Sequence, residues 1–241
     1  MIKTKFGSIV SHKFKNKYIC YSSSIQPILK DRILSANDSD EFRLSNNSNF
    51  LDLNNGFIKK HFWRKGAMSF LNDKYFFYSL KHSRPVRELI NYIDYTYIIN
   101  NSKSDIVNRI EACSPVFSYI KKGNLFYSGD IVLSKIKGDT IDKVLHEDYC
   151  DGEFVSNLAL CFQFLFGNGV YNSDMNLKNI LFNKATGKFS FIDFDKLKIN
   201  LNKKNNKSLT LRVVSKFEKS MQKHNLLNRF DIKKFKNKLM I

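Results

Sequence analysis

Alternating apolar and polar positions predict antiparallel strands in the first half of the chain. One run ends at Leu44, a second covers Phe50–Leu53, and a third covers Phe57–Phe62 directly after an Asn-Gly pair. Asn-Gly between alternating runs is a strong hairpin signal, because both residues tolerate the positive φ of a tight turn. Two further runs, Pro115–Ile120 and Ile131–Ile136, flank a Lys-Lys-Gly-Asn turn and predict another strand pair.

Apolar residues spaced three and four apart predict three helices. The first covers Arg84–Ile99, with Pro85 in its first turn. The second, Phe154–Phe166, is apolar throughout and ends at Gly167. The third, Ser208–Asn225, carries an apolar stripe among basic residues. The back half of the chain is therefore expected to be mainly helical.

The change from strand to helix patterns places a boundary near Lys137-Gly138-Asp139. We expect a single unit of 241 residues in the α+β class, with an N-lobe at 1–137 built from an antiparallel sheet plus a helix, and a mainly helical C-lobe at 138–241. Residues 1–40 form an N-terminal extension in which the pattern indicates only a short strand near Tyr18–Tyr21.

Charge narrows the choice of partners. The chain has 40 Lys and Arg against 22 Asp and Glu, a net charge of +18, which favours nucleic acid, a phosphorylated ligand or an acidic membrane as partner. The 43% hydrophobic content is enough for a core. The four cysteines are far apart and predict reduced thiols. Neither a signal peptide nor an apolar run of about 18 residues is present, so we expect a cytoplasmic protein whose membrane contact is peripheral.

Three oxygen-bearing side chains form the main candidate for chemistry. Asp174 and Asn179 lie five residues apart, and Asp193 follows a strand that the turn Asn183–Gly187 folds back beside the strand Ile180–Phe182. We expect Asp193 to close that second strand and to return to the same end of the hairpin as Asn179. A cluster of carboxylate and amide oxygens suits Mg²⁺, which prefers hard ligands.

This pattern, D-x-x-x-x-N followed by a hairpin and I-D-F, resembles the catalytic loop and metal site of the eukaryotic-like protein kinase superfold. The resemblance implies that Asp174 positions or deprotonates the acceptor hydroxyl, and that Asn179 and Asp193 hold Mg²⁺. It also implies a strand lysine for the phosphates of ATP and a helical glutamate for that lysine, which we assign to Lys60 and Glu88. Lys59 is the alternative lysine, on the opposite face of the same strand.

No glycine-rich loop precedes Lys60. Ser45, Asn46, Asn47 and Ser48 stand where the resemblance places the phosphate loop, and their side chains tolerate tight turns and donate hydrogen bonds, although less freely than glycine. We therefore predict that these residues contribute to ATP binding.

Four segments together resemble the Kdo kinases (3-deoxy-D-manno-octulosonic acid kinases) of the lipopolysaccharide kinase family. That family is known for H-Y-R-R-G, T-R-x-x-R-E, D-L-N-x-x-N-I-L and I-D-F-D-K elements. The corresponding segments are Lys60-His61-Phe62-Trp63-Arg64-Lys65-Gly66, Ser83-Arg84-Pro85-Val86-Arg87-Glu88, Asp174 to Leu181, and Ile192 to Lys196. A further segment, Asn72-Asp73-Lys74-Tyr75, also belongs to the resemblance. The similarity covers roughly Leu44 to Lys223, and I-D-F-D in place of D-F-G favours a small-molecule or glycolipid kinase.

The resemblance implies a small bilobal kinase that uses ATP and Mg²⁺ to phosphorylate Kdo, at its 4-hydroxyl, on Kdo-lipid A during lipopolysaccharide inner core synthesis. Such an enzyme works at the cytoplasmic face of the bacterial inner membrane, whose anionic surface suits the net charge of +18. Arg64, Lys65, Arg84 and Arg87 are candidates for binding the sugar carboxylate and lipid phosphates.

One departure and several alternatives accompany this interpretation. The family has His where this chain has Asn172, and because Asn makes some of the same hydrogen bonds we expect altered rather than absent activity.

The acceptor is alternatively another core sugar such as heptose. A basic nucleic-acid-binding pseudokinase would explain the charge but leave the acidic cluster without a role, so we expect no nucleic-acid partner. The basic run Lys203–Lys238 is interpreted as a solvated helix face over an apolar stripe, with an anionic membrane patch as the alternative.

Overall fold

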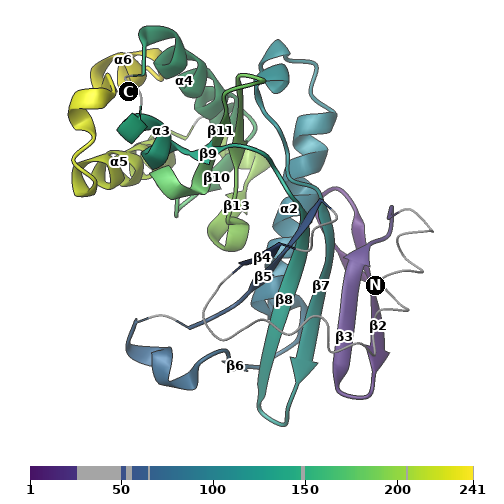
Figure 1. The fold of residues 1–241 in the computed structure, drawn as a ribbon. Coiled ribbons are helices and arrows are strands. Elements are labelled where there is room, and N and C mark those ends of the chain that lie inside the picture. Colours follow the sequence, from purple (N-terminus) through teal and green to yellow (C-terminus); the bar gives the residue numbers. More distant parts are fainter. Residues whose placement is uncertain (26–49, 53–55, 65, 148–149, 205, 241) are drawn as a thin grey trace. The chain divides into compact units, whose positions relative to one another are not determined.

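The computed structural model describes the chain except for residues 26–49, 53–55, 65, 148–149, 205 and 241. The described residues form two compact units (Figure 1). Unit 1 contains residues 1–94 and 114–135, and unit 2 contains residues 95–113 and 136–241. The division after residue 135 lies two residues before the boundary expected from the sequence, and residues 95–113 additionally belong to unit 2.

Unit 1 is an antiparallel sheet with the first part of one long helix, as the α+β class predicts. The strand order is β1-β2-β3-β7-β8-β5-β4, and β6 pairs with β8. The strands are β1 (Ile2–Lys3), β2 (Ser8–Phe14), β3 (Lys17–Ser22), β4 (Phe50–Asp52), β5 (Phe57–His61), β6 (Tyr75–Phe76), β7 (Pro115–Lys122) and β8 (Phe126–Ser134).

Two predicted strand pairs are present. The pair β4–β5 is confirmed, and Gly56 before β5 has φ of 76°, a conformation that glycine adopts without a steric penalty. The pair β7–β8 is also confirmed, but β8 begins at Phe126 and ends at Ser134, whereas the sequence placed that strand at Ile131–Ile136. Pairing between β7 and β8 begins directly after the tight turn that follows Lys122, so β8 starts closer to that turn than the sequence indicated.

The N-terminal extension is more ordered than the sequence indicated. Strands β1 to β3 form a meander, and β3 adds to the sheet by pairing with β7 from Lys17↔Lys121 to Cys20↔Ser118. Ile19 and Tyr21 of β3 pack with Val116 and Val132 in one buried cluster. Pairing with a strand about 100 residues away supplies the partner that local sequence did not reveal.

The helix predicted at Arg84–Ile99 is confirmed as α2 (Arg84–Asn100). Val86 and Leu89 are fully buried on its apolar stripe. Asp94 is also buried, and its carboxylate accepts hydrogen bonds at 3.1–3.2 Å from the main-chain amides of Lys5 and Phe6. These bonds satisfy the buried charge and tie the segment between β1 and β2 to the helix.

Unit 2 combines helices with short antiparallel pairs, and its mainly helical character is confirmed. Its elements are β9 (Asp139–Thr140), α3 (Ile141–Glu147), α4 (Gly152–Gly167), β10 (Val170–Asn172), β11 (Ile180–Asn183), β12 (Lys188–Phe191), β13 (Leu197–Ile199), α5 (Lys207–Lys223) and α6 (Ile232–Lys238). The predicted helices correspond to α4 and α5, each within two residues of the expected start.

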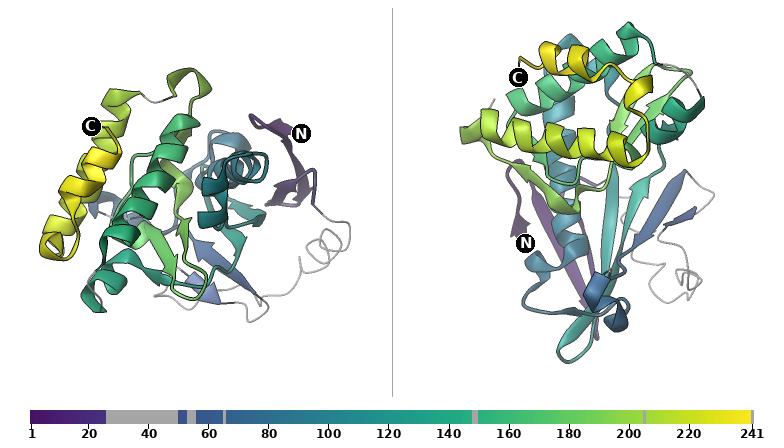
Figure 2. Two further views of the ribbon diagram at one scale, coloured as in Figure 1. Left: turned by 90° about the horizontal axis from the view of Figure 1, so that it is seen from above. Right: turned by 90° about the vertical axis from the view of Figure 1, so that its left-hand side faces the viewer.

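An aromatic core holds the helices of unit 2 together. The ring of Phe162 on α4 lies 5.3–5.7 Å from the rings of Phe191, Phe217 and Phe235, which belong to β12, α5 and α6. Helix α6 packs beside α4 (Figure 2). Phe217 of α5 and Phe235 of α6 are thus buried within the unit, whereas Leu211 of α5 is 46% exposed. Most of the apolar stripe is therefore packed, in agreement with the interpretation of the basic tail as a solvated face over a packed stripe.

The described residues include four buried cysteines, none of which forms a disulfide. Burial raises the pKa of the Cys20 and Cys161 thiols to about 12, so both stay protonated at neutral pH. Within the described residues there is no helix with the length and hydropathy needed to span a membrane.

Candidate active site

Lys60 and Glu88 form a buried ion pair in unit 1. Lys60 Nζ on β5 lies 2.9 and 2.8 Å from the two carboxylate oxygens of Glu88 on α2, and Glu88 is fully buried. The pair brings together two residues that the sequence assigned to ATP binding. A carboxylate that accepts two bonds from one ammonium fixes the position of that ammonium, which suits a phosphate ligand.

Lys59 points to the other face of β5, as strand alternation predicts. It is buried as well, and this burial lowers the pKa of its ammonium while nearby Asp130 opposes the shift. Of the two adjacent lysines, Lys60 is the one beside Glu88.

Two of the arginines expected to bind the acceptor share one aromatic ring in unit 1. The guanidinium carbons of Arg64 and Arg84 lie 4.4 and 5.1 Å from the ring centroid of Tyr75. Arg84 also lies 5.2 Å from the ring centroid of Phe62, and Lys60 Nζ lies 5.0 Å from the same centroid. A cluster of cations held by aromatic faces is a suitable binding surface for an anion.

The other acceptor candidates are less closely grouped. Arg87 is exposed on α2. Burial raises the pKa of the Tyr127 hydroxyl, and the positive charges of Arg84 and Arg87 oppose this shift without cancelling it. Lys65 lies outside the described residues, as do Ser45, Asn46, Asn47 and Ser48 of the predicted phosphate loop.

His61 is held between two carboxylates, an arrangement that sequence reasoning missed. Its Nδ1 lies 2.6 Å from Asp130 Oδ1, and its Nε2 lies 3.4 Å from Asp73 Oδ2. Asp130 is on β8 directly across the ladder from His61, so the contact depends on strand register. No local pattern in the sequence reports that register.

In unit 2, Asp174 and Asn179 are joined by the turn between β10 and β11. Asn179 Nδ2 donates a 2.8 Å hydrogen bond to the main-chain carbonyl of Asp174. Between them, Asn176 caps a short 3₁₀ helix at Leu177–Asn179 by accepting from the Lys178 amide. The D-x-x-x-x-N spacing therefore closes one compact loop with both side chains at defined positions.

Asp193 lies at the same end of the β11–β12 hairpin as Asn179. Ile180 pairs with Phe191, and the Ile192 amide donates to the Asn179 carbonyl at 3.0 Å. The expectation that Asp193 closes the strand is wrong, because β12 ends at Phe191 and Asp193 has left-handed backbone angles, φ 61° and ψ 71°. That conformation is unfavourable for a residue with a Cβ and is a feature of functional sites.

Asn172 connects the two acidic residues. This fully buried side chain donates from Nδ2 to the Asp193 carbonyl (3.2 Å) and accepts at Oδ1 from the Asp174 amide (3.0 Å). An amide both donates and accepts, so Asn172 makes both bonds at once. The residue at the position of the family histidine thus holds the backbone of both loops.

The side-chain oxygen atoms at this end of the hairpin are of the kind that binds a magnesium ion. Because Asn179 Nδ2 donates to a carbonyl, its Oδ1 faces away from that bond and is the atom left for a cation. No group of three or more His, Cys, Asp or Glu with metal-binding geometry occurs among the described residues. One amide and one carboxylate, from Asn179 and Asp193, leave the remaining positions to water and phosphate oxygens, which is the usual mode for Mg²⁺.

Lys196 also belongs to this site, although the sequence indicated no role for it beyond its place in the I-D-F-D-K motif. Its Nζ lies 3.3 Å from Asp174 Oδ2, and both side chains are accessible to solvent. The I-D-F-D-K element, of which it is the last residue, was the available signal.

Comparison with known proteins identifies a family, and the solved structures with weak similarity to this chain include two of WbdD. Residues 40–236 match the Lipopolysaccharide kinase (Kdo/WaaP) family. A crystal structure of monomeric WbdD is 18% identical, covering 60% of this chain and 31% of that chain, with a TM-score of 0.38. A structure of the bifunctional kinase-methyltransferase WbdD is 16% identical, covering 77% of this chain and 40% of that chain, with a TM-score of 0.41. This chain therefore spans less than half of either WbdD structure. A search of curated proteins finds no match.

Proposed function

The chain belongs to the Lipopolysaccharide kinase (Kdo/WaaP) family, and on this premise we propose that it transfers the γ-phosphate of ATP to the 4-hydroxyl of Kdo on Kdo-lipid A. Membership supports a kinase role in lipopolysaccharide biosynthesis. The observation that carries the proposal is the hydrogen-bond network through Asn172 and Asn179 that brings Asp174, Asn179 and Asp193 to one end of the β11–β12 hairpin.

Asp174 is the proposed acceptor of the hydroxyl proton. The acceptor oxygen bonds to the γ-phosphorus, the bond from that phosphorus to the β–γ bridging oxygen breaks, and ADP leaves. Asn172 holds the main-chain amide of Asp174 and Asn179 holds its carbonyl, so the carboxylate is oriented before substrate arrives. Lys196 places a positive charge beside the same carboxylate.

Asn179 and Asp193 are the proposed ligands of Mg²⁺. When bound, the ion neutralises charge on the phosphate oxygens. Asn172 supports this role by holding the Asp193 carbonyl, which stabilises the left-handed backbone from which the Asp193 side chain projects.

Lys60 and the arginines of unit 1 are the proposed binding groups for anions. Lys60, positioned by Glu88, is assigned to the phosphates of ATP. Arg84 shares the Phe62 ring with Lys60, and Arg64 shares the Tyr75 ring with Arg84. Guanidinium groups bind carboxylates through two parallel hydrogen bonds, so we assign Arg64 and Arg84 to the Kdo carboxylate or a lipid A phosphate.

The test is phosphate transfer from labelled ATP. The full chain is incubated with γ-labelled ATP and Mg²⁺ together with Kdo-lipid A, a heptose-bearing core acceptor, or no acceptor, and the labelled product is analysed by mass and by NMR. We expect phosphate on the Kdo 4-hydroxyl. Label on heptose would show that heptose, the alternative sugar, is the acceptor. Absence of transfer in spite of MgATP binding would refute both acceptors.

Two variants and a matched control test the residue roles. Asp174→Ala is expected to abolish transfer while MgATP still binds, and Asp193→Ala is expected to weaken MgATP binding as well. Asp151→Asn, which changes the exposed N-cap of α4 in the same unit, should turn over normally. Turnover by Asp174→Ala at the native rate would show that the catalytic assignment is wrong.

A further inference from the structure

Three segments of unit 1 meet at one end of its sheet. The β2–β3 turn contacts the end of β7, since the Lys122 amide donates to the Asn16 carbonyl at 2.7 Å. The β7–β8 turn contacts β6, since the Phe77 amide donates to the Leu125 carbonyl at 2.9 Å. Both hairpin turns and β6 lie at the lower end of the unit in Figure 1. We call residues 12–17, 74–82 and 121–127 the tip surface.

The tip surface exposes large apolar side chains that do not enter the core. Tyr78 is 86% exposed, Leu125 68%, Phe76 49% and Phe14 41%. The Phe76 ring packs on Phe126 at 4.7 Å, which fixes its direction without covering it. Single exposed apolar residues are common, but several at adjoining turns indicate an interaction surface.

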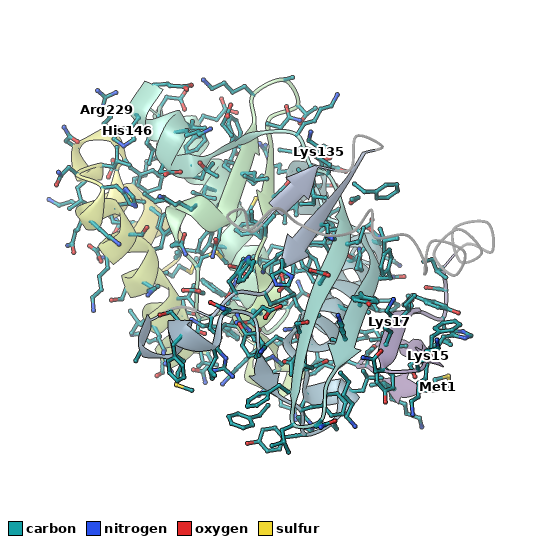
Figure 3. All side chains as sticks on the ribbon, turned by 60° about the horizontal axis from the view of Figure 1, so that its bottom comes forward. Met1, Lys15, Lys17, Lys135, His146 and Arg229 are labelled. Atoms are coloured by element: carbon teal, nitrogen blue, oxygen red, sulfur yellow. The ribbon has the colours of Figure 1, made fainter. Side chains whose placement is uncertain are left out.

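Lysines surround these apolar side chains. The two hairpin turns carry Lys13, Lys15, Lys17, Lys121 and Lys122, and the three segments contain no Asp or Glu. Lys122 Nζ lies 4.8 Å from the Phe77 ring centroid, and Lys13 Nζ lies 5.9 Å from that of Tyr18. Figure 3, in which this end comes forward, labels Lys15 and Lys17. The ammonium groups of Lys122 and Lys13 therefore lie over aromatic rings of the tip surface and its neighbouring strand.

We propose that the tip surface docks unit 1 on an anionic lipid membrane. Tyr78, Leu125 and Phe76 enter the headgroup region, where aromatic and aliphatic side chains are favoured, and the lysines contact lipid phosphates. Charge complementarity selects an anionic surface, and the aliphatic Leu125 at the turn favours lipid, because the boundary between headgroups and acyl chains buries an aliphatic side chain. The purpose of docking, to reach a glycolipid acceptor, rests on the proposed function, whereas the binding itself does not.

Vesicle co-sedimentation of the full chain without ATP tests the proposal. The vesicles are phosphatidylcholine alone or phosphatidylcholine with one third phosphatidylglycerol, at low and at high salt. We expect binding to the anionic vesicles that weakens as salt is raised. Each lysine in contact contributes about 1 kcal/mol, or about fivefold in affinity, so Lys13→Glu with Lys121→Glu should weaken binding by about 25-fold or more.

The matched control reverses two exposed charges elsewhere. Lys216→Glu with Lys219→Glu, on the solvent face of α5 in the basic tail, has the same change in net charge and should weaken binding by less than threefold. An equal loss in both double variants would overturn the proposal, because it would show that net charge alone drives binding. Circular dichroism and thermal unfolding establish that both variants are folded.

The apolar contribution and the alternative partner are tested separately. Tyr78→Ser with Leu125→Ser should weaken vesicle binding at least tenfold and leave retention on single-stranded RNA unchanged. Tight RNA binding without vesicle binding would overturn the proposal in favour of a nucleic-acid surface. Transfer to a detergent-solubilised acceptor should be the same in the Lys13→Glu, Lys121→Glu variant as in the native chain, so failure of docking and failure of the proposed function are distinguishable.

Discussion

Removing the carboxylate of Glu88 should destabilise unit 1 strongly, because the buried Lys60 ammonium loses the carboxylate that it contacts. The two contacts of 2.8 and 2.9 Å place the charges at a separation where their attraction is about 6 kcal/mol at an effective dielectric constant of about 20. Desolvation offsets part of this, and loss of one member of a buried pair lowers the free energy of unfolding by about 3–5 kcal/mol. We predict a loss of that size for Glu88→Ala.

Urea denaturation followed by tryptophan fluorescence measures this loss. Trp63 is the single tryptophan of the chain and belongs to unit 1, so its emission reports the unfolding of that unit. Glu218→Ala is the control, since Glu218 pairs with Lys236 at the same 2.8 Å but near the solvent, where a pair contributes about 0–1 kcal/mol. Because Glu218 belongs to unit 2, its unfolding is followed by circular dichroism, and Glu88→Ala is measured by the same signal for the comparison. If Glu88→Ala changed the unfolding free energy no more than Glu218→Ala does, the argument from burial would be refuted.

The double variant Lys60→Met with Glu88→Leu separates stability from function. Replacing both charges by apolar side chains of similar size leaves no unpaired charge and should recover most of the lost stability. MgATP binding, measured by calorimetry, should nevertheless stay at least tenfold weaker than in the native chain, because the proposed phosphate ligand is gone. Native nucleotide affinity in the double variant would refute the assignment of Lys60.

Three further predictions concern buried polar groups. Asp94→Ala removes the acceptor for two main-chain amides and should lower the unfolding free energy by about 2 kcal/mol in the same urea assay. Asn172→Ala should lower kcat on the order of tenfold to a hundredfold in steady-state assays, because the Asp193 backbone loses its support, and an unchanged kcat would contradict this. Burial raises the pKa values of Cys20 and Cys161 from 9.0 to about 12. The stability that these two thiols contribute should therefore be complete below pH 9 and be lost as the pH rises toward 12. Urea midpoints measured across that pH range test this.

Much of the local structure could be predicted from the sequence, because its signals lie within a few residues. The apolar spacing of Val86 and Leu89 predicted α2, and the Asn-Gly pair predicted the antiparallel pairing of β4 with β5. The D-x-x-x-x-N spacing predicted a loop that carries Asp174 and Asn179 together, because five residues are enough for one side chain to reach the carbonyl of the other. The same kind of short-range pattern was sufficient to indicate the kinase family.

The sequence by itself determined several of the strands and helices, among them β4, β5, β7, α2, α4 and α5, and which residues carry oxygen or positive charge. Only the tertiary structure decided which groups meet: Glu88 is opposite Lys60 rather than Lys59, Asn172 bridges Asp174 to Asp193, and β3 pairs with β7. The physical reason is that strand pairing and helix packing join residues that are distant in the chain. A one-residue shift of register turns every side chain to the opposite face, and no local pattern specifies the partner strand.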